Sequence, residues 1–297
     1  MCDNKMNFIK IIIIFILLVN LNITLKSQTS GTFLKFTNDA KLISLGSIDT
    51  IEGGISNLNL TPAIKLTDSE IIYSVSRIMD EIRYDSIISG IKLGRSNIGI
   101  MIMEAGVKGI DARDDKGQMV GRFKNSNRAI GLNYAYELNR NKVIGISIKQ
   151  ISISIGDNQG GSVCMDIGYS DKINSNLDIG ISVSNISKGI KLNRTTEKLP
   201  TRISVMYGYK IKGMIKIVGS VNRYLEEGPA EYIIGIGYNI LKGIEIRSNY
   251  AYNKRNTDEI DHIRYGIGIK LNKSEINYGM HKQSGVIINS LSVGTKF

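Results

Sequence analysis

The most constraining feature of this sequence is a period of two in its apolar residues, which recurs in short segments from residue 70 to the C-terminus. Residues 127–138, 176–186 and 261–271 show it most clearly, because apolar residues there alternate with small or polar ones. Successive side chains of a strand point to opposite faces, whereas a helix repeats every 3.6 residues. The pattern predicts strands with one apolar face and one polar or small face.

We expect fourteen such strands, an even number that places both ends of a single-chain bacterial barrel on the same side of the membrane. The predicted strands span residues 70–78, 86–94, 97–105, 127–138, 142–155, 161–170, 176–186, 201–210, 214–223, 230–240, 243–252, 261–271, 274–281 and 286–297. The composition suits this reading, since 31 Gly and only 3 Pro fit many strands joined by tight turns.

The predicted connections are sorted by length. Short turns such as 95–96 and 139–141 alternate with longer connections, of which 106–126 and 187–200 are the longest. Outer-membrane barrels have short periplasmic turns and longer extracellular loops, whereas a soluble β-sandwich, the alternative fold, has no reason to sort its loops in this way. We therefore predict an all-β fold, a 14-stranded antiparallel transmembrane outer-membrane β-barrel over residues 68–297.

The N-terminus has the composition of a secretory signal peptide. Lys5 and Lys10 provide a basic start, residues 11–19 form an apolar run, and a polar stretch ends near Ser27. The apolar run is shorter than a membrane-spanning helix needs, which argues against the alternative of an N-terminal anchor helix. We predict a signal peptide over residues 1–27 and a protein of the bacterial outer membrane.

The C-terminal strand ends in a pattern typical of barrel assembly signals. Leu291 and Val293 share a strand face with the terminal Phe297. This arrangement predicts the barrel-assembly machinery as a partner, together with the lipids of the outer membrane.

Polar residues of both charge signs fall on the predicted inner face. These lumen-facing candidates are Asp178, Lys216, Glu245, Arg247, His262, Arg264, Lys270 and Glu275. They predict a wet, narrow interior, in which the charges either line a conducting path or pair with one another and brace a closed barrel. Between residues 142 and 155 the apolar phase slips by one position, which predicts a β-bulge near Lys149.

No residue pattern points to catalysis, a cofactor or a metal. The two histidines, His262 and His281, have no Ser-His-Asp arrangement around them, and Asp111, Asp114 and Asp115 lack the spacing of a calcium loop. We expect a protein that is not an enzyme. The formal net charge is +11, but lysine and arginine are spread along the sequence without a dense patch, so we expect no nucleic-acid partner.

Two groups of residues carry a family resemblance. The first is Phe33-Leu34-Lys35-Phe36, Ala40, Leu42, Leu45-Gly46 and Leu60-Thr61-Pro62-Ala63, and the second is Asn185-Ile186, Ile190-Lys191-Leu192 and Leu199-Pro200-Thr201-Arg202. They resemble the PorV/PorQ family of FadL-like outer-membrane barrels. That family usually reads Asn-Pro-Ala-Gly-Leu where this chain has Thr61-Pro62-Ala63-Ile64-Lys65, so Pro62 and Ala63 carry the match.

The resemblance implies a fourteen-stranded barrel with an N-terminal segment, residues 28–67, packed in the lumen. It also implies one of two functions: passage of small hydrophobic compounds, or a role in type IX secretion in which the loops bind secreted proteins. A sealed barrel with adhesive loops is a third hypothesis. Apolar residues on the inner face would favour passage, and the alternating segments show mostly polar ones.

Overall fold

A computed structural model describes residues 30–46, 55–59, 61–78, 82–193, 195–226, 229–253, 262–283 and 286–297. The predicted signal peptide, residues 1–27, lies outside the described residues.

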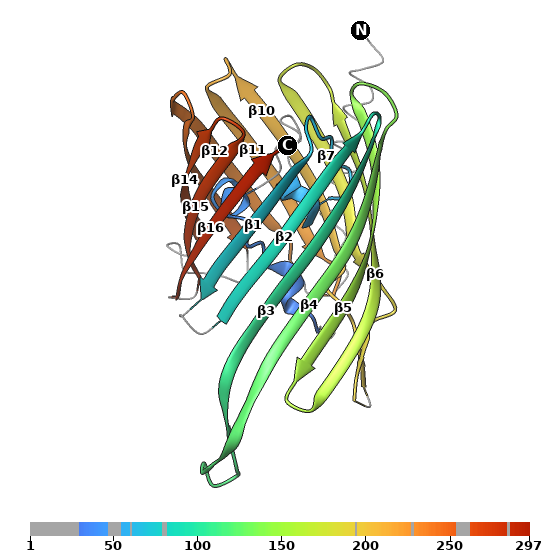
Figure 1. Cartoon of the computed structure of the whole chain (residues 1–297), viewed down its shortest axis with the longest axis vertical. Helices are drawn as coiled ribbons and strands as arrows, with labels where there is room; N and C mark the ends of the chain where they lie inside the picture. Colours follow the sequence, from blue (N-terminus) through green and yellow to red (C-terminus); the bar gives the residue numbers. More distant parts are fainter. Residues whose placement is uncertain are drawn as a thin grey trace.

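Fourteen antiparallel strands close into a barrel, because β1 pairs with β2 on one side and with β16 on the other (Figure 1). The barrel strands are β1 (Glu70–Ile78), β2 (Ile82–Leu93), β3 (Ser96–Arg113), β4 (Met119–Glu137), β5 (Lys142–Ile155), β6 (Asn158–Lys172), β7 (Leu177–Ile186), β10 (Arg202–Ile211), β11 (Ile215–Tyr224), β12 (Glu231–Leu241), β13 (Ile244–Asn253), β14 (Ile263–Leu271), β15 (Ser274–Gln283) and β16 (Val286–Lys296). The predicted fold class is confirmed.

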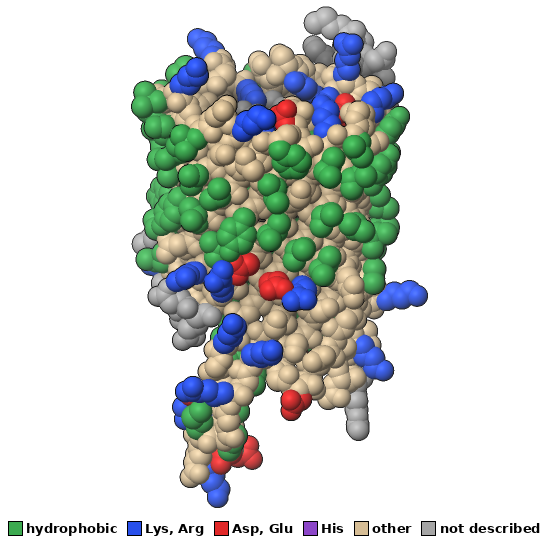
Figure 2. Space-filling view, viewed as in Figure 1, with side chains coloured by type: hydrophobic (Ala, Val, Ile, Leu, Met, Phe, Trp, Pro, Cys, Tyr) green, Lys and Arg blue, Asp and Glu red, His purple; other side chains and the backbone are tan. Residues whose placement is uncertain are grey.

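The outer surface carries a hydrophobic band bounded by charged side chains at both ends (Figure 2). In β3, for example, Ile98, Ile100 and Ile102 are exposed, while Met101 and Met103, on the alternate positions, are buried. Leu291 and Val293 of β16 belong to the exposed face, and Phe297 follows beyond the end of the strand. A closed sheet with an apolar outer face satisfies every strand hydrogen bond internally, as a lipid environment requires.

The prediction of a long loop over residues 106–126 is wrong. Residues 106–126 do not form a loop, because β3 and β4 continue as a paired hairpin that projects from one end of the barrel (Figure 1). Most side chains of this extension are exposed on both faces, so it lacks the period-two apolar signal. The other long connection, 187–200, also contains a small hairpin, formed by β8 (Ile190–Leu192) and β9 (Thr195–Glu197).

The predicted β-bulge near Lys149 is also wrong. β5 pairs without interruption with β4 and with β6. Its outer face changes from Ile148 to polar Gln150, while its inner face changes from Ser147 to buried Ile151. The change in phase of the apolar residues therefore marks a change of environment. Beyond Ile148 the outward-facing residues lie outside the hydrophobic band, and from Ile151 the lumen-facing residues are apolar. The irregularity lies one strand further on, where the pairing of β6 with β7 shifts between Met165 and Ile167.

The described N-terminal residues pack against the inner face of the strands (Figure 1). They form η1 (Thr32–Lys35), α2 (Ala40–Leu45) and η3 (Ile55–Asn59). The Asp39 carboxylate caps α2 by accepting a hydrogen bond from the Leu42 amide at 3.0 Å, and Gly46 ends the helix in the left-handed conformation. α2 contacts β12 to β16, and η3 contacts β1 to β3. No helix among the described residues is long and apolar enough to cross a membrane.

Wall glycines make room for this N-terminal segment. A Cβ atom at Gly235 would overlap the Leu45 carbonyl, and one at Gly145 would overlap the Pro62 carbonyl. Gly235 and Gly266 both lie against α2. Glycine in these strands thus allows another part of the backbone to approach closely.

The projecting hairpin is dispensable for the barrel if the hydrophobic band and the closed sheet hold the fold. Replacing residues 108–124 by Asn-Gly joins Val107 to Asn125, which already face each other across β3 and β4. We expect the shortened protein to keep the heat-dependent gel shift and the melting temperature of the parent. Loss of the folded band on the gel would contradict this assignment.

Candidate functional site

The lumen has an apolar half lined by strands β2 to β6. Apolar side chains from these strands, from the N-terminal segment and from the connection 187–200 form one buried cluster: Phe33, Leu34, Ile55, Leu58, Ile64, Leu66, Ile88, Met101, Met103, Ala105, Ala129, Ile151, Ile153, Cys164, Ile190 and Leu199. Burying these side chains against the wall holds the segment in the barrel. Sequence reasoning expected a mostly polar lumen and missed this cluster.

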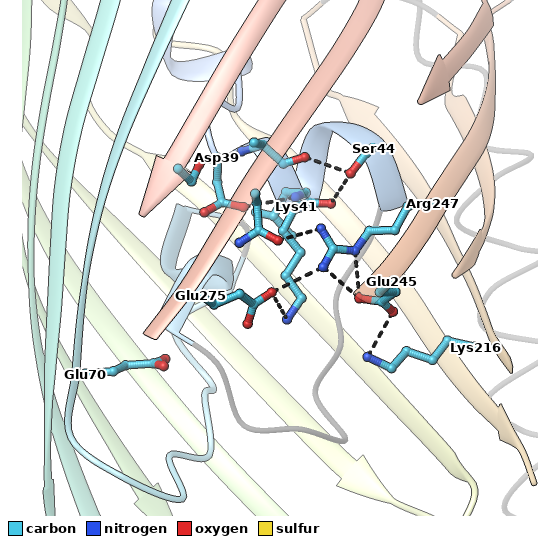
Figure 3. A network of polar contacts seen from close by, with 12 residues as sticks. Asp39, Lys41, Ser44, Glu70, Lys216, Glu245, Arg247 and Glu275 are labelled. Carbon is cyan, nitrogen blue, oxygen red and sulfur yellow. Dashed lines mark hydrogen bonds and ion pairs between the residues drawn. The ribbon is translucent and has the colours of Figure 1, made fainter. Parts of the chain in front are cut away.

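The opposite half of the lumen contains a charged network around Arg247 (Figure 3). The Arg247 Nε donates to Glu245 at 2.8 Å, and its Nη2 lies 3.2 Å from Glu275 Oε1. Lys216 Nζ lies 3.3 Å from the other oxygen of Glu245. Lys41 of α2 reaches Glu275 at 3.6 Å and thereby links the helix to the wall. Such buried charges are tolerated because each faces an opposite charge.

The structure brings together four of the eight lumen-facing candidates. Lys216, Glu245, Arg247 and Glu275 share the charged network. The remaining four lie elsewhere: Asp178 is buried on β7, Arg264 pairs with Glu231 at 3.4 Å, Lys270 is exposed at one end of β14, and His262 precedes that strand.

His262 is buried, with 4% exposure. It precedes β14, so strand alternation does not set the direction of its side chain. Its ring packs against Tyr250 and Tyr252, with centroid separations of 5.4 and 6.1 Å, and its Nδ1 lies 2.6 Å from the Ala251 carbonyl oxygen. His262 therefore packs near the end of β13, apart from the charged network.

A buried polar cluster fills the irregularity between β6 and β7. Lys149 Nζ lies 2.7 Å from Asp166 and donates to Asn185 Oδ1 at 2.6 Å. The backbone N–H of Asn185 donates a hydrogen bond to Asp166 Oδ1 at 2.7 Å. Asn185 itself has a left-handed backbone conformation, with φ of 62°. The cluster therefore replaces the strand pairing that is missing here. Asn185 was noted only as part of a family motif, and its contacts with Lys149 and Asp166 were not foreseen.

The Pro62-Ala63 motif crosses the inner face of β4 to β6. Both residues are buried, and the Pro62 carbonyl accepts a hydrogen bond from Asn133 Nδ2 at 3.0 Å. Thr61, at the position where the family usually has Asn, accepts a hydrogen bond from the Ala63 amide through its Oγ1 at 3.2 Å.

A cavity of about 450 Å³ opens in the lumen near the strand ends on the side of the projecting hairpin. Aromatic rings gather on one part of its wall, where Phe36 lies 4.5 Å from Tyr84 and 6.3 Å from His281 between ring centroids. Arg202 and Arg264 lie on other parts of the wall. A cavity of this size accommodates a small organic molecule.

If Arg247 holds the charged network together, its loss should be far more damaging than loss of an exposed ion pair. Arg247→Leu leaves Glu245 and Glu275 without their shared cation, and breaking a buried pair of this kind costs roughly 3–5 kcal/mol. Urea unfolding in phospholipid vesicles measures this cost. Arg83→Leu, which removes an exposed pair with Asp85, is the matched control and should have a much smaller effect. Equal destabilisation by the two substitutions would contradict the proposed importance of the network.

Known structures share this barrel fold. The Pseudomonas putida toluene transporter TodX is 10% identical with a TM-score of 0.56, over 91% of this chain and 98% of TodX. The monoaromatic hydrocarbon channel CymD is 10% identical with a TM-score of 0.60, over 87% and 97% of the two chains. A Pseudomonas aeruginosa FadL homologue is 10% identical with a TM-score of 0.56, over 92% and 100%. No protein-family model and no curated protein matches the sequence. At this level of identity the likeness shows a FadL-like barrel fold.

Proposed function

We propose that this protein is a channel of the bacterial outer membrane that passes small hydrophobic compounds. The observation that carries the proposal is the apolar half of the lumen, where Met101, Met103 and Ile151 belong to one buried cluster with the N-terminal segment. An apolar inner lining has no polar groups to replace the water bound to ions or sugars, but it solvates a hydrocarbon. The likeness in fold to channels for monoaromatic hydrocarbons supports the same substrate class.

The proposed path begins in the cavity beside Phe36 and Tyr84 and continues into the apolar half of the lumen. The N-terminal segment blocks this path and must shift for a solute to pass. Residues 28–67 then act as the gate, and the Pro62-Ala63 turn against Gly145 and Gly168 is part of its seat. The charged network on the other half of the lumen anchors α2 while the rest of the segment moves.

In this proposal, a signal at each end of the chain directs the protein to the outer membrane. Residues 1–27 direct export and are then removed, and the barrel-assembly machinery reads Leu291, Val293 and Phe297. Leu291 and Val293 are each 44% exposed, and Phe297 is 64% exposed, so all three are accessible at the barrel surface.

Uptake of radiolabelled toluene by cells that produce the protein tests the proposed substrate class. We expect faster uptake than in cells with an empty vector, and slower uptake for Met101→Glu, which places a charge in the apolar lining. Met119→Glu, at an exposed position on the projecting hairpin, is the control and should leave uptake unchanged. Uptake at the empty-vector rate by a correctly folded barrel would refute the proposal.

We further propose that the solute leaves sideways through the wall at the β6–β7 irregularity. A disulfide between Met165→Cys and Ile186→Cys, which are paired positions, would lock the wall there in a Cys164→Ala background. Oxidation should slow toluene uptake several-fold, and reduction should restore it. The control pair Ile267→Cys and Tyr278→Cys locks regular pairing between β14 and β15 and should have no effect. Identical results for both locks would exclude this exit.

A second candidate function is favoured by the projecting hairpin. The PorV/PorQ resemblance allows a role in type IX secretion, in which the barrel anchors secreted proteins. Met119 and Val120 near the hairpin tip are 51% and 65% exposed, so they offer an apolar contact to such a partner. Purification from native membranes with identification of bound proteins tests this role. Secretion components bound to the full protein but not to the hairpin-shortened variant would support it, whereas binding to neither would exclude it.

A further inference from the structure

One end of the barrel has a cation at every turn. The six turns opposite the projecting hairpin span residues 94–95, 138–141, 173–176, 212–214, 242–243 and 272–273, all of which the structure describes. Each turn contains or directly follows a lysine or arginine, in chain order Arg95, Arg140, Lys172, Lys212, Lys242 and Lys273. None of the six turns contains an aspartate or glutamate. Lysine and arginine, which look scattered in the sequence, are thus brought together at this end by the topology.

The other end of the barrel has a different charge pattern. Ion pairs occur at both ends, since Arg128 lies 2.6 Å from Glu104 at this end and Lys296 lies 2.9 Å from Asp68 beside the turns. The described connections at this end, however, contain acidic residues themselves, among them Asp114, Asp115 and Asp157. Figure 2 shows the contrast, with blue side chains predominating beyond one edge of the green band and blue and red mixed beyond the other. The turn end is therefore the more electropositive of the two.

The cations of the turns stand directly beside exposed apolar side chains. Leu93, Leu138, Met214, Leu241 and Leu271 lie within two residues of the turn cations and are 53%, 45%, 49%, 63% and 57% exposed. An apolar residue close to a cation is the arrangement of an interfacial anchor, in which the apolar part enters the hydrocarbon and the charge remains at headgroup depth. The turns therefore place six cations in a ring at the depth of lipid phosphates.

We propose that this ring binds anionic phospholipid headgroups of the leaflet that surrounds the turns. This inference rests on the proposed membrane location and adds a lipid specificity to it. Clustered lysine and arginine at a membrane surface attract anionic lipid, and the attraction falls off within a Debye length. The lipid shell holds the turn end at a fixed depth while the N-terminal segment moves inside the barrel.

Spin-labelled lipids measure the preference directly. The full mature chain is reconstituted in phosphatidylcholine vesicles, and the protein-restricted fractions of spin-labelled phosphatidylglycerol and phosphatidylcholine are compared. We expect at least about a twofold preference for phosphatidylglycerol at low salt, and its loss near 1 M salt, where the Debye length is about 3 Å. The test variant carries Arg140→Gln, Lys212→Gln, Lys242→Gln and Lys273→Gln. The matched control carries Lys108→Gln, Lys116→Gln, Lys124→Gln and Lys191→Gln at exposed positions away from the turns.

The test variant should lose the preference for phosphatidylglycerol, and the control, with the same net charge, should keep it. A wild-type preference near one, or equal loss in both variants, would overturn the proposal and leave the possibility of an acidic protein as the partner of the ring. The heat-dependent gel shift of the same samples separates the two levels of inference. Absence of the gel shift would refute the membrane barrel itself. A gel shift without a preference for phosphatidylglycerol would refute only the proposed lipid binding by the ring of cations.

Discussion

Closure of the sheet by hydrogen bonds between β1 and β16 is the constraint on which the rest of this structure depends. In a hydrocarbon environment an unpaired strand edge leaves backbone donors and acceptors unsatisfied, so the sheet must close and its outer face must be apolar. A ring of fourteen strands encloses a wider space than its own side chains fill. The N-terminal segment occupies that space, and the wall glycines beneath Leu45 and Pro62 allow it to approach.

The two halves of the lumen hold this segment by different forces, and that difference suits a gate. Around Arg247 the contacts are between opposite charges, and Lys41 of α2 joins them through Glu275 at 3.6 Å. Around Met101 and Met103 the contacts are apolar and non-directional, so a small hydrophobic solute replaces them at little cost. The pairing irregularity between β6 and β7 adjoins the apolar half, where Lys149, Asp166 and Asn185 substitute for regular pairing. The proposed path and the proposed exit thus lie on the same side of the barrel.

Strand alternation predicted the number of strands and much of the charged network, since it assigns a face to every residue of a regular strand. It failed where the environment of a face changes. In the middle of β3 both faces are apolar, because Ile100 faces outward and Met101 faces the lumen, so no polar residue there reveals the inner face. In β5 the apolar residues switch from the outer face to the inner face, and in the sequence this switch has the same pattern as a β-bulge near Lys149. Contacts between distant segments, such as Lys41 with Glu275 or Asn185 with Asp166, are set by closure of the barrel and have no local signal.

The most direct test of an apolar solute path is methyl NMR of the protein labelled with ¹³C-methyl methionine, titrated with toluene. Met101, Met103 and Met206 are each 2% exposed, whereas Met280 is 37% exposed on the outer face and Met119 is 51% exposed on the hairpin, so one sample contains both the probes and their controls. Saturable shifts of Met101 and Met103, with intermolecular contacts to toluene and no change at Met119, are the predicted result. Shifts confined to Met280 would show that toluene only dissolves around the barrel and would contradict the account.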